Sequence, residues 1–315
     1  MKNKKKFKIL ISAIPLVPVF RNYRKYFDKK KFLIDLKKTR QFLSENELIK
    51  IIKNYDGVIC GDDEFTHKVF SKAKKLKVIS KWGTGINSID LDTAKKHNIK
   101  VCNTPSAFSY SVATMAMAMI LAYQRKLIIN HNLVRKNKWP KLLGETLLNK
   151  KVGIIGLGNI GKKIFQMMSG FETINFANDL KKINRNFLNN FNIKQVSKDK
   201  IFKDCNIIIT ACDLNNSSYH LINKKNLRKM RNDVLIVNIS RGPLIDNIAL
   251  IDFLKKNKKA GACLDVFEKE PLNRNNKFLK LSNCVLGSHN AFNTTDEVEK
   301  THINTIKNII KNLRQ

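Results

Sequence analysis

The chain has 315 residues, and a length of this order favours about two domains with a substantial buried core. Hydrophobic residues make up 43% of the chain, and no apolar run reaches the roughly 20 residues that a membrane-spanning helix needs. The formal net charge of +35 is spread along the sequence, so we interpret most of it as solvated surface that favours small anionic partners, and we predict neither a specific nucleic-acid site nor a membrane partner.

The beginning of the chain has two interpretations. Lysines at positions 4, 5, 6 and 8 precede an apolar stretch, as in a signal peptide, but Pro15 and Pro18 interrupt that stretch and no small-residue cleavage site follows. A buried first strand within 7–13 explains the same pattern. Further apolar runs predict strands at 57–60, 78–80 and 100–102, and helical patterns cover 45–54 and 67–75.

After Pro105 the pattern changes to one long apolar helix, predicted over 109–127 and dense in Ala and Met. Such a stripe is typical of a packing surface between domains or subunits, and it suggests a homodimer contact. Residues 128–150 are polar and predicted to be irregular. A second series of strands is predicted at 151–155, 173–177, 207–210, 234–238, 260–264 and 284–286, and a closing helix at 301–313. The alternation predicts α/β layering with parallel sheets.

The six cysteines indicate a reduced, cytoplasmic protein. They stand at positions 60, 102, 205, 212, 263 and 284, mostly beside aliphatic residues. No pair forms a C-x-x-C motif and no histidine pattern completes a zinc site, so we predict buried free thiols and no metal.

A glycine-rich turn follows the strand at 151–155 and predicts a dinucleotide site. Gly156 permits a tight turn, Gly158 lets the backbone approach a pyrophosphate, and Gly161 lets the next helix pack closely. The N-terminus of that helix attracts phosphate. Asp179 follows the next strand and can accept hydrogen bonds from the adenosine ribose, which favours NAD over NADP, although Lys181 and Lys182 weaken this preference.

Three polar residues in the last third of the chain combine into a chemical hypothesis. Arg241, Glu270 and His289 supply a fixed cation, a carboxylate and an imidazole. These groups can hold a 2-oxo or 2-hydroxy acid and move its hydroxyl proton. Each residue alone also has a structural interpretation, as an ion-pair partner or a loop residue.

Five ordered motifs make the chain resemble the D-isomer-specific 2-hydroxyacid dehydrogenases, in particular the phosphoglycerate dehydrogenase-like branch in a short form without the regulatory domain. The resemblance covers nearly the whole chain from about Gly57 onward. Its motifs are SKWGTGINSID at 80–90, VCNTP at 101–105, the glycine turn, NISRG at 238–242, and DVFEKEP at 265–271 followed by His289. The resemblance implies an α/β fold of two Rossmann-like domains with doubly wound parallel sheets. A cleft is expected between a flavodoxin-like substrate domain (1–105 plus 293–315) and an NAD-binding domain (106–292).

The resemblance also implies roles for individual residues. Arg241 is expected to grip the substrate carboxylate, His289 to exchange the proton, and Glu270 to orient and tune the imidazole. Backbone N–H groups of Thr84 and Gly85 are expected to complete the carboxylate pocket. The expected cofactor contacts are Thr84, Gly156, Gly158, Asn159, Ile160, Gly161, Asp179, Cys212, Ile239 and Asp265, the last near the nicotinamide end.

Some positions depart from the family pattern. Lys81 stands where the family more often has Arg, and the segment at 211–214 (ACDL) replaces a His-x-Pro-Leu pattern beside the cofactor. The expected activity is hydride transfer between NAD and C2 of a small anionic hydroxy acid, with 3-phosphoglycerate weakly favoured. Two alternatives remain: a non-enzymatic NAD-sensing, corepressor-like binding protein, and a polyanion or nucleic-acid binder on the same fold.

Overall fold

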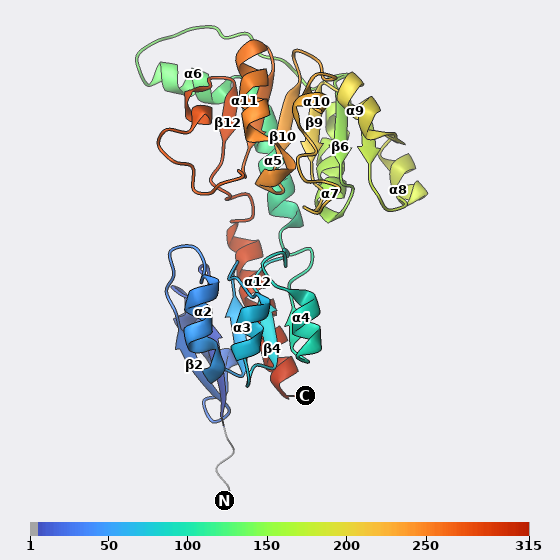
Figure 1. The fold of residues 1–315 in the computed structure, drawn as a ribbon. Helices are drawn as coiled ribbons and strands as arrows, with labels where there is room; N and C mark the ends of the chain where they lie inside the picture. Colours follow the sequence, from blue (N-terminus) through green and yellow to red (C-terminus); the bar gives the residue numbers. More distant parts are fainter. Residues whose placement is uncertain (1–5, 315) are drawn as a thin grey trace, which may run out of the picture. The chain divides into compact units, whose positions relative to one another are not determined.

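The computed structural model describes residues 6–314, so the first lysines of the signal-peptide-like pattern, Lys4 and Lys5, lie outside the described residues. The chain forms two compact units, and each is described by itself (Figure 1). Unit 1 combines the N-terminal part of the chain up to Phe108 with the segment from Thr294 onwards, and unit 2 is Ser109–Asn293. The resemblance places the two domain boundaries after residues 105 and 292. In the structure they lie after Phe108 and Asn293, which is three residues and one residue later.

Unit 1 is built on a five-stranded sheet in which every strand runs parallel to its neighbours. The strand order is β2-β1-β3-β4-β5, which is the flavodoxin-like arrangement. The strands are β1 (Phe7–Ile11), β2 (Phe32–Leu36), β3 (Gly57–Cys60), β4 (Val78–Lys81) and β5 (Lys100–Cys102). The loops after β3 and β4 lie at the carboxyl edge of the sheet, where open α/β sheets bind ligands.

Helices cover both faces of this sheet (Figure 1). Val58 and Cys60 on β3 belong to an apolar core shared with α2, α3 and α4, whereas Gly57 on the opposite face lies against α12. The helices and 3₁₀ turns of unit 1 are α1 (Phe20–Tyr23), η1 (Arg24–Tyr26), α2 (Glu45–Ile51), η2 (Ile52–Asn54), α3 (His67–Lys72), α4 (Leu91–Lys96) and α12 (Thr295–Arg314). Successive residues of β3 point to opposite faces of the sheet, so the strand packs against helices on both sides.

Unit 2 contains a seven-stranded parallel sheet with the order β12-β11-β10-β9-β6-β7-β8. Its strands are β6 (Lys151–Ile155), β7 (Ile174–Asn178), β8 (Ile193–Gln195), β9 (Ile207–Thr210), β10 (Leu235–Asn238), β11 (Gly261–Leu264) and β12 (Cys284–Leu286). The first strand of the unit, β6, lies between β7 and β9, so the order reverses beside it. This is the Rossmann arrangement, and the reversal marks the expected dinucleotide crevice.

The helices of unit 2 lie on both faces of its sheet. They are α5 (Ser109–Gln124), α6 (Leu127–Val134), α7 (Asn159–Met168), α8 (Arg185–Asn190), α9 (Lys198–Asp204), α10 (Lys224–Leu227) and α11 (Asn247–Lys256), with 3₁₀ turns η3 (Ser169–Phe171), η4 (Gly242–Leu244) and η5 (Lys277–Lys280). One core joins α9, α10 and α11 to the sheet. On the other face α5 packs against α7 and β11, so its apolar stripe is used inside unit 2.

The sequence prediction missed or misplaced several elements. Strands β2 and β8 were not predicted, because Asp35 interrupts the apolar run of β2 and two of the three residues of β8 are polar; only Ile193 of β8 is buried. The segment 128–150 was expected to be irregular, which is wrong for its first part, where α6 forms. The closing helix α12 begins at Thr295, six residues before the predicted start, because its first turns are polar and lack an apolar stripe.

Among residues 6–314, no single helix has both the length and the apolar composition needed to cross a membrane. Helices α5 and α6 meet those criteria only as a pair bent by 62°, on length and composition alone. Eight of the residues in α5 are buried.

Candidate active site

The glycine-rich turn has the backbone geometry that a dinucleotide site requires. Gly156, directly after β6, has a φ of +98°, and a Cβ placed there would lie 2.4 Å from the backbone nitrogen of Cys212. Only glycine fits such a position. A Cβ at Gly158, by contrast, would meet nothing within 4 Å, and one at Gly161 would lie 2.3 Å from the Gly156 carbonyl oxygen. The turn is therefore packed against protein at Gly156 and Gly161 and open at Gly158.

Asp179 joins this turn to the end of β7. Its Oδ2 accepts a hydrogen bond from the Leu157 N–H (2.6 Å), and its Oδ1 accepts one from the Lys181 N–H (2.7 Å). A carboxylate oxygen has more than one acceptor site, so these bonds leave capacity for ribose hydroxyls. The open space at Gly158 and the N-terminus of the ten-residue helix α7 suit a pyrophosphate. These residues fit a bound dinucleotide.

The contrast between two glycines gives a matched test. We expect Gly158→Ala to leave the melting temperature nearly unchanged and to weaken NADH binding by about tenfold, because its methyl group would occupy the space left for the pyrophosphate. Gly156→Ala is expected to lower the melting temperature as well, since it adds both a clash and backbone strain. NADH fluorescence titration and thermal unfolding measure the two effects. Equal NADH affinity for Gly158→Ala and the parent protein would contradict the assignment.

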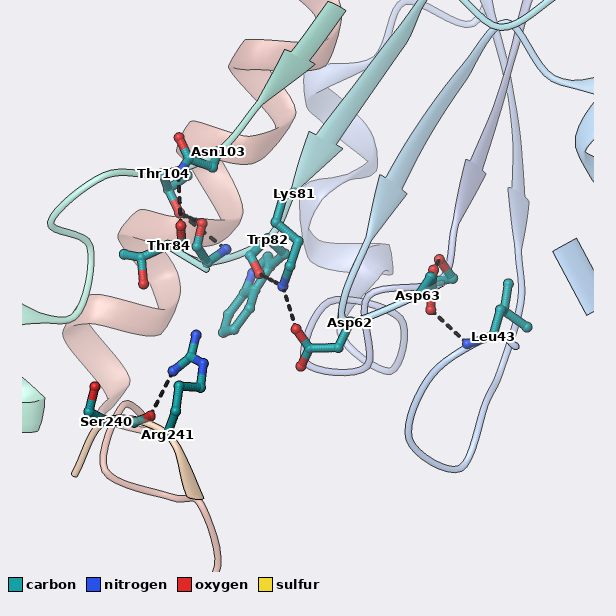
Figure 2. A network of polar contacts seen from close by, with 12 residues as sticks. Leu43, Asp62, Asp63, Lys81, Trp82, Thr84, Asn103, Thr104, Ser240 and Arg241 are labelled. Atoms are coloured by element: carbon teal, nitrogen blue, oxygen red, sulfur yellow. Dashed lines mark hydrogen bonds and ion pairs between the residues drawn. The ribbon is translucent and has the colours of Figure 1, made fainter. Parts of the chain in front are cut away.

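Arg241 follows β10, and residues at the end of that strand and directly after it bond both its side chain and its backbone. Its Nη1 donates a hydrogen bond to the Ser240 carbonyl oxygen at 2.8 Å (Figure 2), and its own carbonyl oxygen accepts one from Asn238 Nδ2 at 2.9 Å. Asn238 is almost fully buried, and its Oδ1 also accepts bonds from the Ser240 N–H and the Thr210 hydroxyl. Asn238 thus fixes the backbone that carries the guanidinium. In the sequence, Asn238 stands out only as the first residue of the NISRG motif.

Glu270 and His289 form a hydrogen-bonded pair in which Glu270 Oε2 lies 2.7 Å from His289 Nδ1. The other carboxylate oxygen of Glu270 accepts the Phe267 N–H at 2.8 Å, which fixes the carboxylate in place. The hydrogen bond that His289 donates to Glu270 raises the pKa of His289 against the opposing effect of burial. Burial favours a higher pKa for Glu270, but the bond and charge of His289 outweigh it and lower that pKa. Arg241 acts electrostatically on both groups, so the trio is one coupled cluster.

The loop that carries His289 is anchored by Asp265, which is 1% exposed. The two carboxylate oxygens of Asp265 accept the N–H groups of Asn290 (3.0 Å) and Ala291 (2.9 Å), and its carbonyl oxygen accepts that of His289 (2.7 Å). Burial raises the pKa of Asp265, although these donors oppose the shift. His289 itself has a φ of +56°, a conformation uncommon for non-glycine residues. Asp265 therefore acts here as an anchor of the histidine loop.

The remaining expected cofactor residues lie around the glycine turn of unit 2. Asn159 and Ile160 form the first turn of α7, directly after Gly158. Cys212, whose backbone faces Gly156, accepts the Ser240 hydroxyl on its carbonyl oxygen at 2.6 Å, and Ile239 is 5% exposed. The 211–214 segment that departs from the family pattern is therefore linked to the Arg241 loop as well as to the glycine turn.

Thr84 and Gly85 belong to unit 1, in the turn after β4, and Figure 2 shows Thr84 there. Gly83, just before them, has a φ of +110°, so the turn depends on a glycine there. The Thr84 carbonyl oxygen accepts a hydrogen bond from Asn103 Nδ2 at 2.8 Å, and Thr104 bonds the Gly83 backbone. Asn103 and Thr104 come from the second family motif, so the structure brings the two N-terminal motifs together.

Comparison with known proteins decides the family. Residues 117–291 match the model described as D-isomer specific 2-hydroxyacid dehydrogenase, NAD binding domain. The chain belongs to this family. A hydroxypyruvate reductase from Thermotoga maritima is 34% identical over 284 residues, covering 89% of this chain and 92% of that protein. A glyoxylate reductase from Thermofilum pendens is 32% identical, covering 86% and 82% respectively. The apo-structure of D-lactate dehydrogenase from Escherichia coli superposes with a TM-score of 0.81 at 26% identity, covering 98% and 96%.

Family membership establishes the class of chemistry. The protein is an NAD-dependent dehydrogenase that acts on the CH–OH group of 2-hydroxy acids, and its two parallel α/β sheets are the Rossmann-like fold expected from the sequence. The expectation of NAD as cofactor is confirmed by the matched NAD-binding domain. These similarities favour an enzyme over both non-catalytic alternatives.

Proposed function

We propose that the protein reduces a small 2-oxo acid to the D-2-hydroxy acid, and oxidises it in the reverse direction, with Arg241, Glu270 and His289 as its catalytic residues. The observation that carries the proposal is the coupled cluster in unit 2, where Glu270 and His289 are 2.7 Å apart and Arg241 acts electrostatically on both. An imidazole tuned by a carboxylate, beside a fixed guanidinium, suits an acid that carries its own carboxylate.

Each of the three residues has a distinct task in the proposal. The planar guanidinium of Arg241 binds the substrate carboxylate and orients the 2-oxygen. His289 donates its proton from Nε2 to the 2-oxygen during reduction and takes it back during oxidation, since Nδ1 is occupied by Glu270. Glu270 holds the ring and stabilises the imidazolium. Bound NADH supplies the hydride that reaches C2.

The other site residues remain proposals of the same kind. Thr84 and Gly85 are proposed to donate backbone N–H groups to the substrate carboxylate. The glycine turn with Asn159, Ile160 and Asp179 is proposed to hold the adenosine and pyrophosphate, and Thr84, Cys212, Ile239 and Asp265 to lie along the rest of the cofactor. The domain assignment belongs to this proposal too, with unit 1 as the substrate domain and unit 2 as the NAD-binding domain.

We propose 2-oxo acids of two or three carbons, such as glyoxylate or hydroxypyruvate, as substrates. The names of the hydroxypyruvate and glyoxylate reductases described above support this choice over 3-phosphoglycerate, which the sequence weakly favoured. The test is the oxidation of NADH, followed by absorbance, against glyoxylate, pyruvate, hydroxypyruvate and 3-phosphohydroxypyruvate. Turnover of at least one unphosphorylated acid is expected. Absence of turnover with every acid, while NADH still binds, would contradict the proposed function.

The pair Glu270–His289 leads to a pH prediction. Reduction needs a protonated His289, whose pKa Glu270 raises, so activity persists as the pH rises until His289 loses its proton. Glu270→Gln removes the charge and lowers that pKa, and the alkaline limb of the kcat profile for reduction should move to lower pH. Glu268→Gln is a matched control, because Glu268 bonds a different histidine, His220, at 2.6 Å. An alkaline limb that stays in place in Glu270→Gln would contradict the role.

A homodimer is proposed from an exposed apolar surface in unit 2. Leu127 on α6 is 61% exposed, and Trp139 and Leu143 in the following segment are 77% and 93% exposed. Exposed apolar side chains in such number are typical of subunit contacts, and a second copy of the chain is the proposed partner. We propose this surface as the dimer contact in place of α5, because the apolar stripe of α5 packs against α7 and β11 of the same unit. Light scattering should give twice the chain mass, and Leu143→Glu should reduce it to one chain; a monomeric parent protein would contradict the proposal.

A cytoplasmic location is proposed from the cysteines. All six are free, and Cys60, Cys205 and Cys263 are buried. Free thiols persist in the reducing cytoplasm. Titration of the unfolded protein, purified without reductant, should find every thiol reactive, and a disulfide would count against the location.

A further inference from the structure

Asn238 ends β10, between the neighbouring strands β9 and β11 of the unit 2 sheet, and is 1% exposed. Its amide bonds three groups. Oδ1 accepts hydrogen bonds from the Ser240 N–H (3.2 Å) and the Thr210 hydroxyl (3.0 Å), and Nδ2 donates one to the Arg241 carbonyl oxygen (2.9 Å). A buried amide bonded in this way keeps one orientation, because turning it would exchange its donor and its acceptor.

These bonds hold the peptide that joins Ser240 to Arg241. Asn238 bonds the N–H of Ser240 on one side of this peptide and the carbonyl oxygen of Arg241 on the other. The Leu244 N–H also donates to that carbonyl oxygen, at 3.2 Å. The carbonyl oxygen of the peptide itself, that of Ser240, accepts Arg241 Nη1 at 2.8 Å (Figure 2). Asn238 therefore acts on the guanidinium through a peptide that it holds on both sides.

The backbone of Asn238 connects the Arg241 loop to the loop of His289. Its carbonyl oxygen accepts the Asp265 N–H at 3.0 Å, and the Asp265 carbonyl oxygen accepts the His289 N–H at 2.7 Å. The side chain of Asn238 thus holds Arg241, while its backbone bonds the residue that anchors His289.

The Arg241 loop also packs closely on the segment that carries Glu270. A Cβ at Gly242, the residue after Arg241, would overlap the carbonyl group of Phe267. The Phe267 N–H in turn holds the Glu270 carboxylate at 2.8 Å. Since the two backbones already touch, a loop released from Asn238 is expected to move away from Glu270.

We propose that Asn238 is a positioning residue of the reaction, which keeps the Arg241 guanidinium in a fixed place relative to the Glu270–His289 pair. The inference rests on the proposed function and adds a residue that acts through Arg241. In that function Arg241 binds the carboxylate of a small acid while His289 reaches the 2-oxygen of the same molecule. A misplacement of about 1 Å between such groups can lower a rate by about a hundredfold.

Asn238→Leu keeps the approximate size of the side chain and removes its three hydrogen bonds. We expect kcat/KM for hydroxypyruvate to fall by about ten- to a hundredfold. NADH affinity should stay within about twofold, because Ser240 keeps its own bond to the Cys212 carbonyl oxygen. Thr210→Val is a milder variant that removes one bond to the amide, and a loss of about two- to fivefold is expected. Parent values of kcat/KM in both variants would overturn the proposal.

Asn283→Leu is the matched control in the same unit. Asn283 Nδ2 also holds backbone carbonyl oxygens, those of Leu254 (3.2 Å) and Ala260 (2.8 Å). The residue precedes β12, at the amino end of the strand, whereas Asn238 lies at the carboxyl end of β10. Asn283→Leu should lower the melting temperature, as Asn238→Leu does, and leave kcat/KM unchanged. An equal fall in kcat/KM for the two variants would attribute the effect to lost stability and overturn the proposal.

A double-variant cycle tests whether Asn238 acts through Arg241. Added to Arg241→Met, Asn238→Leu should lower kcat/KM by less than about twofold more, because no guanidinium is left to position. A purely structural role would add its full loss of about tenfold or more. That additive result would overturn the proposal.

Binding of oxamate, a non-reducible analogue of a 2-oxo acid, separates this inference from the proposed function. Calorimetry in the presence of NADH should show oxamate bound by the parent protein and about tenfold more weakly by Asn238→Leu. If the parent protein binds oxamate but reduces none of the acids, the proposed function is wrong, and the affinity of the variant still tests the positioning role. If the parent protein reduces hydroxypyruvate and Asn238→Leu equals it in kcat/KM and oxamate affinity, only the positioning role is wrong. If the parent protein neither binds oxamate nor reduces any of the acids, both proposals are wrong.

Discussion

Replacement of His289 by glutamine is expected to lower kcat by about two to four orders of magnitude, while NADH binding stays within about twofold of the parent protein. Glutamine is close in size to histidine and can still bond Glu270, but it cannot carry a proton to or from the 2-oxygen. The affinity for NADH should be preserved because the glycine turn and Asp179 are held by their own bonds, independently of His289. Steady-state kinetics with hydroxypyruvate and NADH fluorescence titration measure both quantities.

The control for this variant is His220→Gln in the same unit. His220 also bonds a carboxylate, that of Glu268 at 2.6 Å, so the two variants remove the same kind of pair. His220→Gln should keep kcat within about twofold of the parent protein. Comparable kcat values for the two variants would contradict the role of His289. A His289→Gln protein that kept full cellular function would instead favour the NAD-sensing, corepressor-like alternative.

Replacement of Arg241 by methionine is expected to lower kcat/KM by about two to three orders of magnitude, because the substrate carboxylate loses its charged partner. Arg241→Lys keeps the charge but loses the planar fork, and about a tenfold loss should remain. The backbone of the site should be preserved in both variants, since Asn238 bonds the carbonyl oxygen of residue 241 and not its side chain. The measurement is kcat/KM for hydroxypyruvate together with the melting temperature.

Arg231→Lys serves as the control for this prediction. Arg231 makes an exposed two-point ion pair with Asp233, at 2.8 and 3.0 Å, so the same substitution removes a comparable fork away from the trio. Its kcat/KM should equal that of the parent protein. If Arg241→Met kept more than about a third of the parent kcat/KM, a carboxylate anchor at this position would be wrong.

The sequence predicted most of the strands and missed two of the four edge strands. Five of the strand ranges, at 57–60, 100–102, 151–155, 207–210 and 284–286, coincide with β3, β5, β6, β9 and β12, since strands of parallel sheets are short apolar runs bounded by polar residues. The edge strands β2 and β8 and the polar first turns of α12 carried no such signal. For these elements the neighbouring chain, and not local composition, decides the structure.

By itself the sequence determined the class of fold, the glycine turn for the dinucleotide and the three residues of the proposed chemistry. These depend on residue types at fixed spacing, which chain order preserves. Only the tertiary structure decided what holds them. Asn238 fixes the Arg241 loop, Asp265 the His289 loop, and Asn103 with Thr104 the turn of unit 1. Such contacts join side chains to backbone groups of other segments, so no local pattern in the sequence specifies them.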